Sequence, residues 1–162
     1  MKLILLWICF FAVLAWAAVH DWKTMEIPDR CHLLIIVLAF VRLGVLGYSG
    51  YPVSWISHLT GVVCVSLPML IITWMITGAF GLGDVKLMAA GGFFMGAERI
   101  VVSFFIAVLL GGIYGIYLLA VKGVNKKTQF PFGPFLCMGM TIGGLYGEEI
   151  LRWYLKLLGL SA

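Results

Sequence analysis

The stretch Gly81-Leu82-Gly83-Asp84 places an acidic side chain at the start of an apolar run that continues through residues 85–97. A charged acid at membrane depth costs about 2.5–3.5 kcal/mol on insertion scales, so an acid in this setting needs a reason to be there. A second acid, Asp21, ends another apolar run far upstream. If the fold brings the two carboxylates together, they can share one proton and activate a water molecule.

The composition around these acids is that of a membrane protein. Of the 162 residues, 63% are hydrophobic and 11% are charged, and the mean hydropathy is +1.10. A small soluble domain cannot cover so much apolar surface with polar groups. The net charge of +4 comes mostly from side chains at the ends of apolar runs, so it indicates topology in a lipid bilayer. We expect no nucleic-acid partner, because the basic residues are not clustered.

Six apolar runs have roughly the length that a bilayer requires. They cover residues 3–19, 31–46, 55–76, 85–97, 100–121 and 132–146. The fourth run is short, as expected of a helix that begins below the surface or leans on its neighbours, and an amphipathic tail follows the sixth. The sequence therefore predicts an all-α polytopic membrane protein, a bundle of six transmembrane helices forming one membrane-embedded domain over residues 1–162.

Loop charge predicts the orientation. The loops after the first, third and fifth runs share one side of the membrane, and with the start of the fourth run they carry Lys23, Arg30, Lys86, Lys122, Lys126 and Lys127. The other side carries Lys2, Arg99, Arg152 and Lys156. The positive-inside rule then makes the first side cytoplasmic. On this topology Asp21, Asp84 and the Pro-rich segment 130–135 all lie at the cytoplasmic face of the plasma membrane.

The first run also has features of a signal peptide, with Lys2 before it and Ala15-Trp16-Ala17 as a candidate cleavage site. The bulky apolar residues continue almost to Ala17. Cleavage there would leave Asp21 near a free, extracytoplasmic end. We therefore expect a retained transmembrane helix.

Each polar residue near the two acids also has a simpler structural interpretation. A helix that ends near His20 would not favour an acid next to it, so capping does not explain Asp21, although a solvated loop acid remains an alternative. Asp84 is a good candidate for the N-cap of the helix that follows it. Gly81 and Gly83 permit positive φ and the close approach of an extended substrate backbone.

Two further charged residues are open to two interpretations. Asp29 follows Ile27-Pro28 and is typical of a helix start. Lys86 is a candidate for snorkelling to the membrane surface, or for a cation that biases the acid pair.

The histidines and cysteines do not show metal-ligand spacing. His20 and His32 have no partner at the spacing of a zinc site. The four cysteines, Cys9, Cys31, Cys64 and Cys137, form no CxxC pair and are typical of small buried hydrophobic residues. We expect neither a metal nor another cofactor.

Three motifs in this order resemble those of the type IV prepilin peptidases, including their short Tad-type and archaeal preflagellin relatives, which are GxGD-type intramembrane aspartic proteases. The motifs are an Asp before Ile27-Pro28, then Gly81-Leu82-Gly83-Asp84-Val85-Lys86-Leu87, and then Pro131-Phe132-Gly133-Pro134-Phe135-Leu136. The resemblance implies that Asp21 and Asp84 are the catalytic pair. It also implies that Gly81, Gly83, Lys86, Pro131, Gly133 and Pro134 shape the site or bind the substrate.

The same resemblance implies a function. Such enzymes cut the leader from class III signal peptides of prepilins, pseudopilins or preflagellin-like proteins, after a small residue at the cytoplasmic membrane edge, and serve pilus or secretion machinery. Many members have Asn after Ile-Pro where this chain has Asp29, which leaves open a third carboxylate near the site. The long members also carry an insertion with paired CxxC motifs that is associated with N-methylation. This sequence lacks that insertion, so we expect a peptidase without methyltransferase activity.

Two other classes of protein share some of these features. A small transporter or channel also carries acids and Gly-rich broken helices, but more often shows internal repeats and acids near the midplane. A non-catalytic pilus or secretion assembly factor, derived from a peptidase, is the other alternative. The predicted position of both acids at one face, and the presence of both, favour the peptidase.

Overall fold

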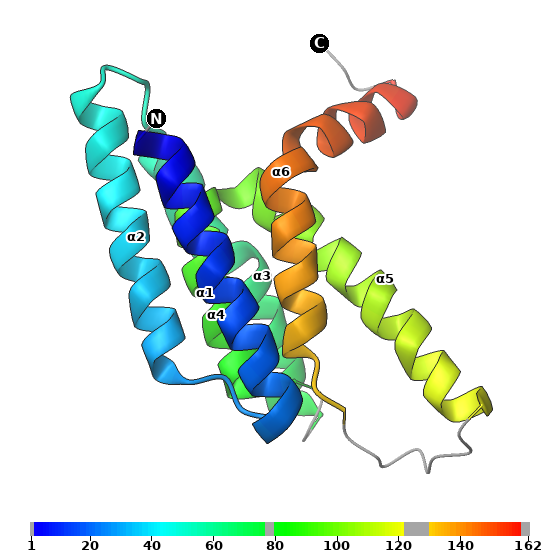
Figure 1. Ribbon diagram of the computed structural model, residues 1–162. Helices are drawn as coiled ribbons and strands as arrows, with labels where there is room; N and C mark the ends of the chain where they lie inside the picture. The colour runs from blue at the N-terminus through cyan, green and yellow to red at the C-terminus, as the bar shows by residue number, and fades with distance from the viewer. Residues whose placement is uncertain (1, 77–79, 122–129, 160–162) are drawn as a thin grey trace.

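The computed structural model describes residues 2–76, 80–121 and 130–159, and every regular element in these ranges is an α-helix (Figure 1). The six helices are α1 (Lys2–Thr24), α2 (Asp29–Tyr48), α3 (Trp55–Met75), α4 (Leu82–Met95), α5 (Ala97–Val121) and α6 (Gly133–Leu157). The all-α prediction is confirmed. Lys122, Lys126 and Lys127, on which the predicted orientation partly depends, lie outside the described residues.

Four of these helices, α1, α2, α3 and α5, are long and apolar enough to cross a membrane. Two boundaries differ from the sequence prediction. Helix α1 continues to Thr24, so Asp21 lies inside its last turn and not after its end. Helix α6 continues to Leu157, so the expected amphipathic tail belongs to the same helix, which bends before its C-terminal part (Figure 1).

Helix α4 is the centre of the bundle although it has only 14 residues. It packs against α2, α3, α5 and α6, and α1 passes in front of it in Figure 1. The ring of Phe94 stacks on that of Phe10 in α1, with centroids 4.2 Å apart. Nine of its residues are buried, from Asp84 to Met95, so the helix shows no polar face. The absence of a charged stripe in the sequence agrees with the burial of most of this helix.

Small residues allow α3 to cross α4 at backbone contact. Gly61 in α3 and Gly92 in α4 meet directly, and a Cβ atom on Gly92 would overlap the carbonyl oxygen of Gly61. Close approach of this kind increases van der Waals contact between helices, which is a main source of helix association in lipid.

The far end of α4 is held by side chains from two neighbouring helices. Nδ1 of His58 in α3 lies 2.9 Å from the carbonyl oxygen of Phe93. Arg42 in α2 donates to the carbonyl oxygen of Phe94 at 2.8 Å, and its guanidinium lies over the rings of Trp7 and Phe94. These contacts provide partners for carbonyls that a helix end leaves free, and they explain a charged residue in an apolar run.

The α3–α4 crossing leads to a stability prediction. We expect Gly92→Ala to lower the free energy of unfolding by about 1–3 kcal/mol, because the new methyl group must displace the α3 backbone. Thermal unfolding of the purified protein in detergent measures the change. Gly44→Ala is the matched control, since a Cβ on Gly44 meets nothing within 4 Å. Equal melting temperatures for Gly92→Ala and Gly44→Ala would contradict the proposed backbone contact.

Candidate active site

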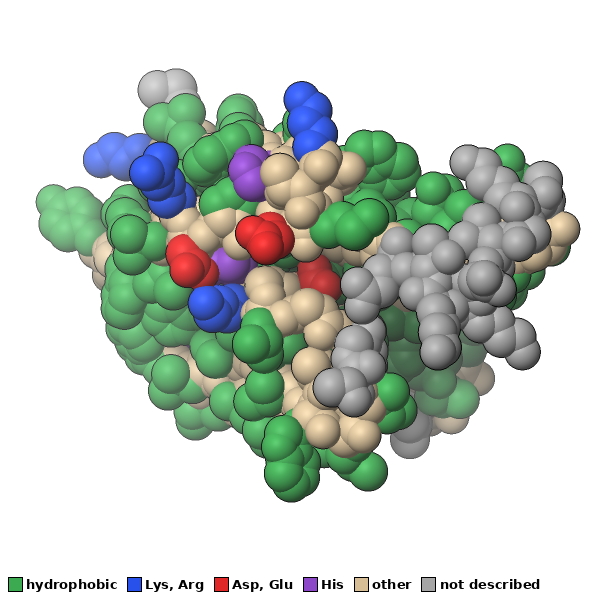
Figure 2. Space-filling model, turned by 90° about the horizontal axis from the view of Figure 1, so that it is seen from below, with side chains coloured by type: hydrophobic (Ala, Val, Ile, Leu, Met, Phe, Trp, Pro, Cys, Tyr) green, Lys and Arg blue, Asp and Glu red, His purple; other side chains and the backbone are tan. Residues whose placement is uncertain are grey.

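The predicted site residues gather at the end of the bundle where α1 ends and α2, α4 and α6 begin, the lower end in Figure 1. Figure 2 shows this end, with acidic side chains grouped near its centre. A pocket of about 300 Å³ opens here. It is lined by Asp21, Met25, Glu26, Ile27, Asp29, Gly81, Leu82, Gly83, Asp84 and Lys86.

Asp21 reaches the pocket from the last turn of α1 and is only 4% exposed. Its Oδ2 atom accepts a hydrogen bond of 3.0 Å from the backbone N–H of Gly133, the first residue of α6. The start of α6 thus offers a backbone donor that stabilises the carboxylate, as helix N-termini do for anions. The contact joins residues 21 and 133, which only the tertiary fold brings together.

Gly133 has no room for a side chain. A Cβ atom there would lie 2.6 Å from Oδ2 and 2.9 Å from Cγ of Asp21, and 3.1 Å from Cδ1 of Ile27. The glycine therefore permits the close approach on which the Asp21 hydrogen bond depends. Pro134 follows it as an early residue of α6, where proline is favoured. Pro131 and Pro134 do not line the pocket.

Asp84 enters the pocket from the first turn of α4 and is 7% exposed. The prediction that Asp84 is the N-cap was wrong, because Gly81 is the N-cap and Asp84 is the third residue of the helix. From that position Oδ2 of Asp84 accepts a hydrogen bond of 3.2 Å from the N–H of Gly81. An acid at the third position commonly reaches back in this way, and it satisfies one of the free donors of the helix start.

The two glycines before Asp84 do not use the positive φ that the prediction allowed. Gly81 has a φ of −72°, and Gly83 is not among the residues with positive φ. A Cβ on Gly83 would lie 3.3 Å from Cβ of Ile27, so a side chain there would press on the α1–α2 loop. Gly83 therefore packs closely on the protein itself, and with Gly81 it also lines the pocket.

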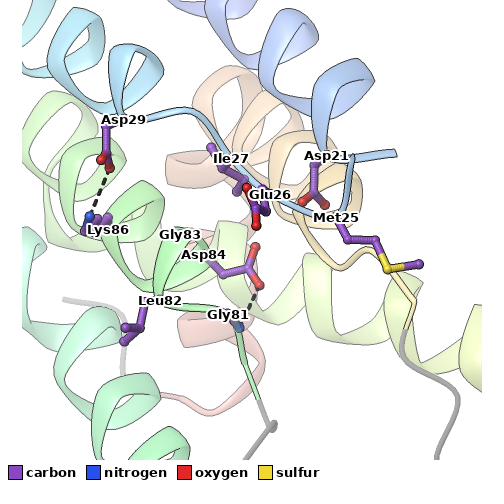
Figure 3. Close-up of a pocket in the computed structure, with 10 residues that line it drawn as sticks. All are labelled: Asp21, Met25, Glu26, Ile27, Asp29, Gly81, Leu82, Gly83, Asp84 and Lys86. Carbon is purple, nitrogen blue, oxygen red and sulfur yellow. Dashed lines mark hydrogen bonds and ion pairs between the residues drawn. The ribbon is translucent and has the colours of Figure 1, made fainter. Parts of the chain in front are cut away.

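The pocket carries four acids and one lysine. Figure 3 shows Asp21, Glu26 and Asp84 reaching into it from three different segments. Two buried carboxylates beside one cavity repel each other when both are ionised, so the arrangement favours a state in which one of them holds a proton. Such a pair can take a proton from one partner and give a proton to another.

Asp29, the third carboxylate that the sequence left open, pairs with a lysine and not with the two buried aspartates. Its side chain is 82% exposed, and its Oδ1 atom lies 2.9 Å from Nζ of Lys86. Figure 3 shows this pair on the side of the pocket away from Asp21. The lysine therefore pairs with Asp29, and within the described parts of the chain it forms no ion pair with Asp21 or Asp84. In the part of the chain that the structure describes, no three His, Cys, Asp or Glu side chains could hold a metal ion together.

Three pocket neighbours were given no role from the sequence. Met25 has a left-handed backbone, with φ of 56°, and turns the chain out of α1. Ile27 is 9% exposed and contacts both Gly83 and Gly133. His32 places Nε2 3.0 Å from the carbonyl oxygen of Gly83. Gly83 and Gly133, which lie against Ile27, could have indicated from the sequence that a bulky side chain packs there. Nothing in the neighbouring sequence marks Met25 or His32.

Comparison of the sequence with known proteins identifies its family. The profile of the type IV leader peptidase family matches residues 8–116, more than half of the chain. This chain belongs to that family. The matched region includes Asp21 and Asp84 and ends before Gly133.

Relatives in the family are similar over most of this chain. A prepilin leader peptidase/N-methyltransferase of Bacillus subtilis (strain 168) is 33% identical over 150 residues, which cover 93% of this chain and 59% of the relative. A protein of the same description from Pseudomonas putida is 33% identical over 146 residues, or 86% of this chain and 48% of the relative. The chain thus spans about half to three-fifths of the length of these relatives. No solved structure matches it.

The Gly133 contact leads to a prediction for a chain of this peptidase family. We expect Gly133→Ala to displace the Asp21 carboxylate and, if this chain has the peptidase activity of its family, to lower that activity by about 10- to 100-fold, the scale expected of a misplacement near 1 Å. A cleavage assay with a purified prepilin measures the loss. Gly112→Ala serves as the control, because a Cβ there meets nothing within 4 Å. Unchanged cleavage by a folded Gly133→Ala protein would contradict this role for the glycine.

Proposed function

We propose that this chain is a membrane aspartic endopeptidase in which Asp21 and Asp84 are the catalytic pair. The observation that carries the proposal is that two aspartates from separate helices are both buried and both line one pocket. Membership of the type IV leader peptidase family supports peptide hydrolysis as the reaction. Each aspartate accepts one backbone N–H through Oδ2, which leaves the other carboxyl oxygen for water or substrate.

The proposed mechanism is general acid–base hydrolysis by the pair. The ionised aspartate takes a proton from a water molecule while the water oxygen attacks the scissile carbonyl carbon. The protonated aspartate gives its proton to the carbonyl oxygen, forming a neutral tetrahedral intermediate. When the C–N bond breaks, the leaving nitrogen receives the proton taken from water, and the hydroxyl returns its proton to the pair. No covalent intermediate is needed.

The proposed topology is a single domain of six transmembrane helices with the pocket at the cytoplasmic face of the plasma membrane. Helices α1, α2, α3 and α5 have the required length and apolarity. Helices α4 and α6 would complete the bundle, with α4 held inside its neighbours. Lys23, Arg30 and Lys86 lie at the pocket end, which supports its placement on the cytoplasmic side. Acids at one end of the bundle support a peptidase more than a transporter.

The proposed substrates are prepilins or related proteins with class III leaders, and the partners are pilus or secretion machinery. The names of the relatives, prepilin leader peptidase/N-methyltransferase, support this substrate class. We propose that the present 162 residues carry the peptidase activity without the methyltransferase activity. Their four cysteines form no CxxC pair of the kind associated with methylation.

The aspartate pair gives the central prediction. We expect Asp21→Asn and Asp84→Asn each to reduce leader cleavage by at least about 10²–10⁴-fold, because neither amide can transfer the required proton. The assay follows the mobility shift of a co-expressed or purified prepilin, and mass spectrometry of the new N-terminus shows whether it is methylated. Glu98→Gln is the control, as an exposed acid in the first turn of α5. Full activity in either aspartate variant would end the proposal.

The pH dependence gives a second prediction. The rate should pass through a maximum, because the pair works with one carboxyl ionised and the other protonated. Below the optimum the ionised aspartate gains a proton and cannot activate water. Above it the protonated aspartate loses the proton that it donates. A profile of kcat/KM against pH that rises steadily to an alkaline plateau would argue against a shared-proton pair.

A further inference from the structure

We propose that His32 is a positioning residue that holds the first turn of α4, and with it Asp84, against the start of α2. This inference rests on the proposed function of Asp84. It begins from the burial of the imidazole, which is only 6% exposed although it lies one turn from the start of α2. Burial of a polar ring without partners is costly, so the contacts that it makes determine where it can sit.

One ring nitrogen contacts the backbone that carries Asp84. Nε2 lies 3.0 Å from the carbonyl oxygen of Gly83, the residue immediately before Asp84. A carbonyl oxygen can only accept, so Nε2 must carry the proton in this contact. The hydrogen bond therefore links the second helix to the turn that aims Asp84 into the pocket.

A second contact closes a loop between the same two helices. Oδ1 of Asp29, at the start of α2, lies 2.9 Å from Nζ of Lys86 in α4. Helix α4 is thus joined to α2 at the Gly83 carbonyl and again at the Lys86 side chain. We call the set of His32, Asp29 and Lys86 the α2–α4 tether. The exposed ion pair contributes little by itself, so the buried His32 bond is the specific part.

The tether acts on the part of α4 that bears the catalytic carboxylate. Ile27, in the loop just before α2, packs on Gly83 and also contacts Gly133, which holds Asp21. A change in the distance between α2 and the first turn of α4 therefore changes the placement of Asp84 relative to Asp21. Catalysis by a carboxyl pair depends on that placement, and an error near 1 Å can lower a rate by about 10²-fold.

A histidine in α3 offers a matched control. His58 is also buried, at 8% exposure, and contacts the carbonyl oxygen of Phe93 at 2.9 Å. It therefore makes the same kind of contact to α4, but at the end away from the pocket. A role in folding alone would make the two histidines equivalent. A positioning role would make only His32 important for the chemical step.

The test compares kcat, KM and melting temperature for His32→Leu, His32→Gln, His32→Asn and His58→Leu, using full-length protein in detergent and a purified prepilin as the probe. The amide nitrogen of Gln lies as many bonds from the backbone as Nε2, whereas that of Asn lies one bond closer. We expect His32→Leu and His32→Asn to lower kcat by about 10- to 100-fold with KM little changed. His32→Gln should recover most of that loss, and His58→Leu should keep the kcat of wild type per folded molecule.

Two results would overturn the inference. One is equal kcat per folded molecule for His32→Leu and His58→Leu. The other is failure of His32→Gln to exceed His32→Asn. Asp84→Asn in the same assay distinguishes a failure of the His32 inference from a failure of the proposed function. If Asp84→Asn is inactive while His32→Leu has the same kcat as His58→Leu, only the positioning role of the tether is rejected. If Asp84→Asn is active, the proposed catalytic pair is rejected, and the positioning role is rejected with it.

Discussion

Helix α4 imposes the constraint on which the rest of the structure depends, because it is short and buried while both its ends carry polar backbone groups. Fourteen residues extend about 21 Å at 1.5 Å each, which is less than the roughly 30 Å of a bilayer core. Free N–H and C=O groups in such surroundings cost several kcal/mol each. The neighbouring helices supply partners at both ends, since His58 and Arg42 contact its last carbonyls and His32 contacts its first turn. The helix's own Asp84 accepts the hydrogen bond from the N–H of Gly81.

The pocket arises from the same requirement. Asp84 satisfies the donor at Gly81, and Asp21 satisfies the donor at Gly133, where α6 begins. In both cases one carboxyl oxygen accepts a glycine N–H at a helix start. The contacts that complete two helix ends thus also fix two acids beside one cavity. This structural role is compatible with the proposed chemical role, because the contacts to the glycines use only the Oδ2 atom of each aspartate.

Much of this arrangement could be predicted from the residues, and the misses have identifiable causes. The apolar runs predicted the helices closely, and the parity of the crossings placed Asp21 and Asp84 at one end of the bundle. The local role of each acid was harder to predict. Asp21 was expected after a helix end but lies inside α1, and Asp84 was expected at the N-cap but lies at the third position. Helix ends are set by tertiary contacts, which hydropathy does not contain.

The sequence by itself determined the helical elements and which polar residues would share one end, because the length, apolarity and order of the apolar runs can be read along the chain. It also carried the motifs that place the chain in its family. Only the tertiary structure decided that Gly133 holds Asp21, that Gly83 packs on Ile27 and that His32 reaches the Gly83 carbonyl. These contacts join residues far apart in the chain, and their geometry depends on how closely the helices pack.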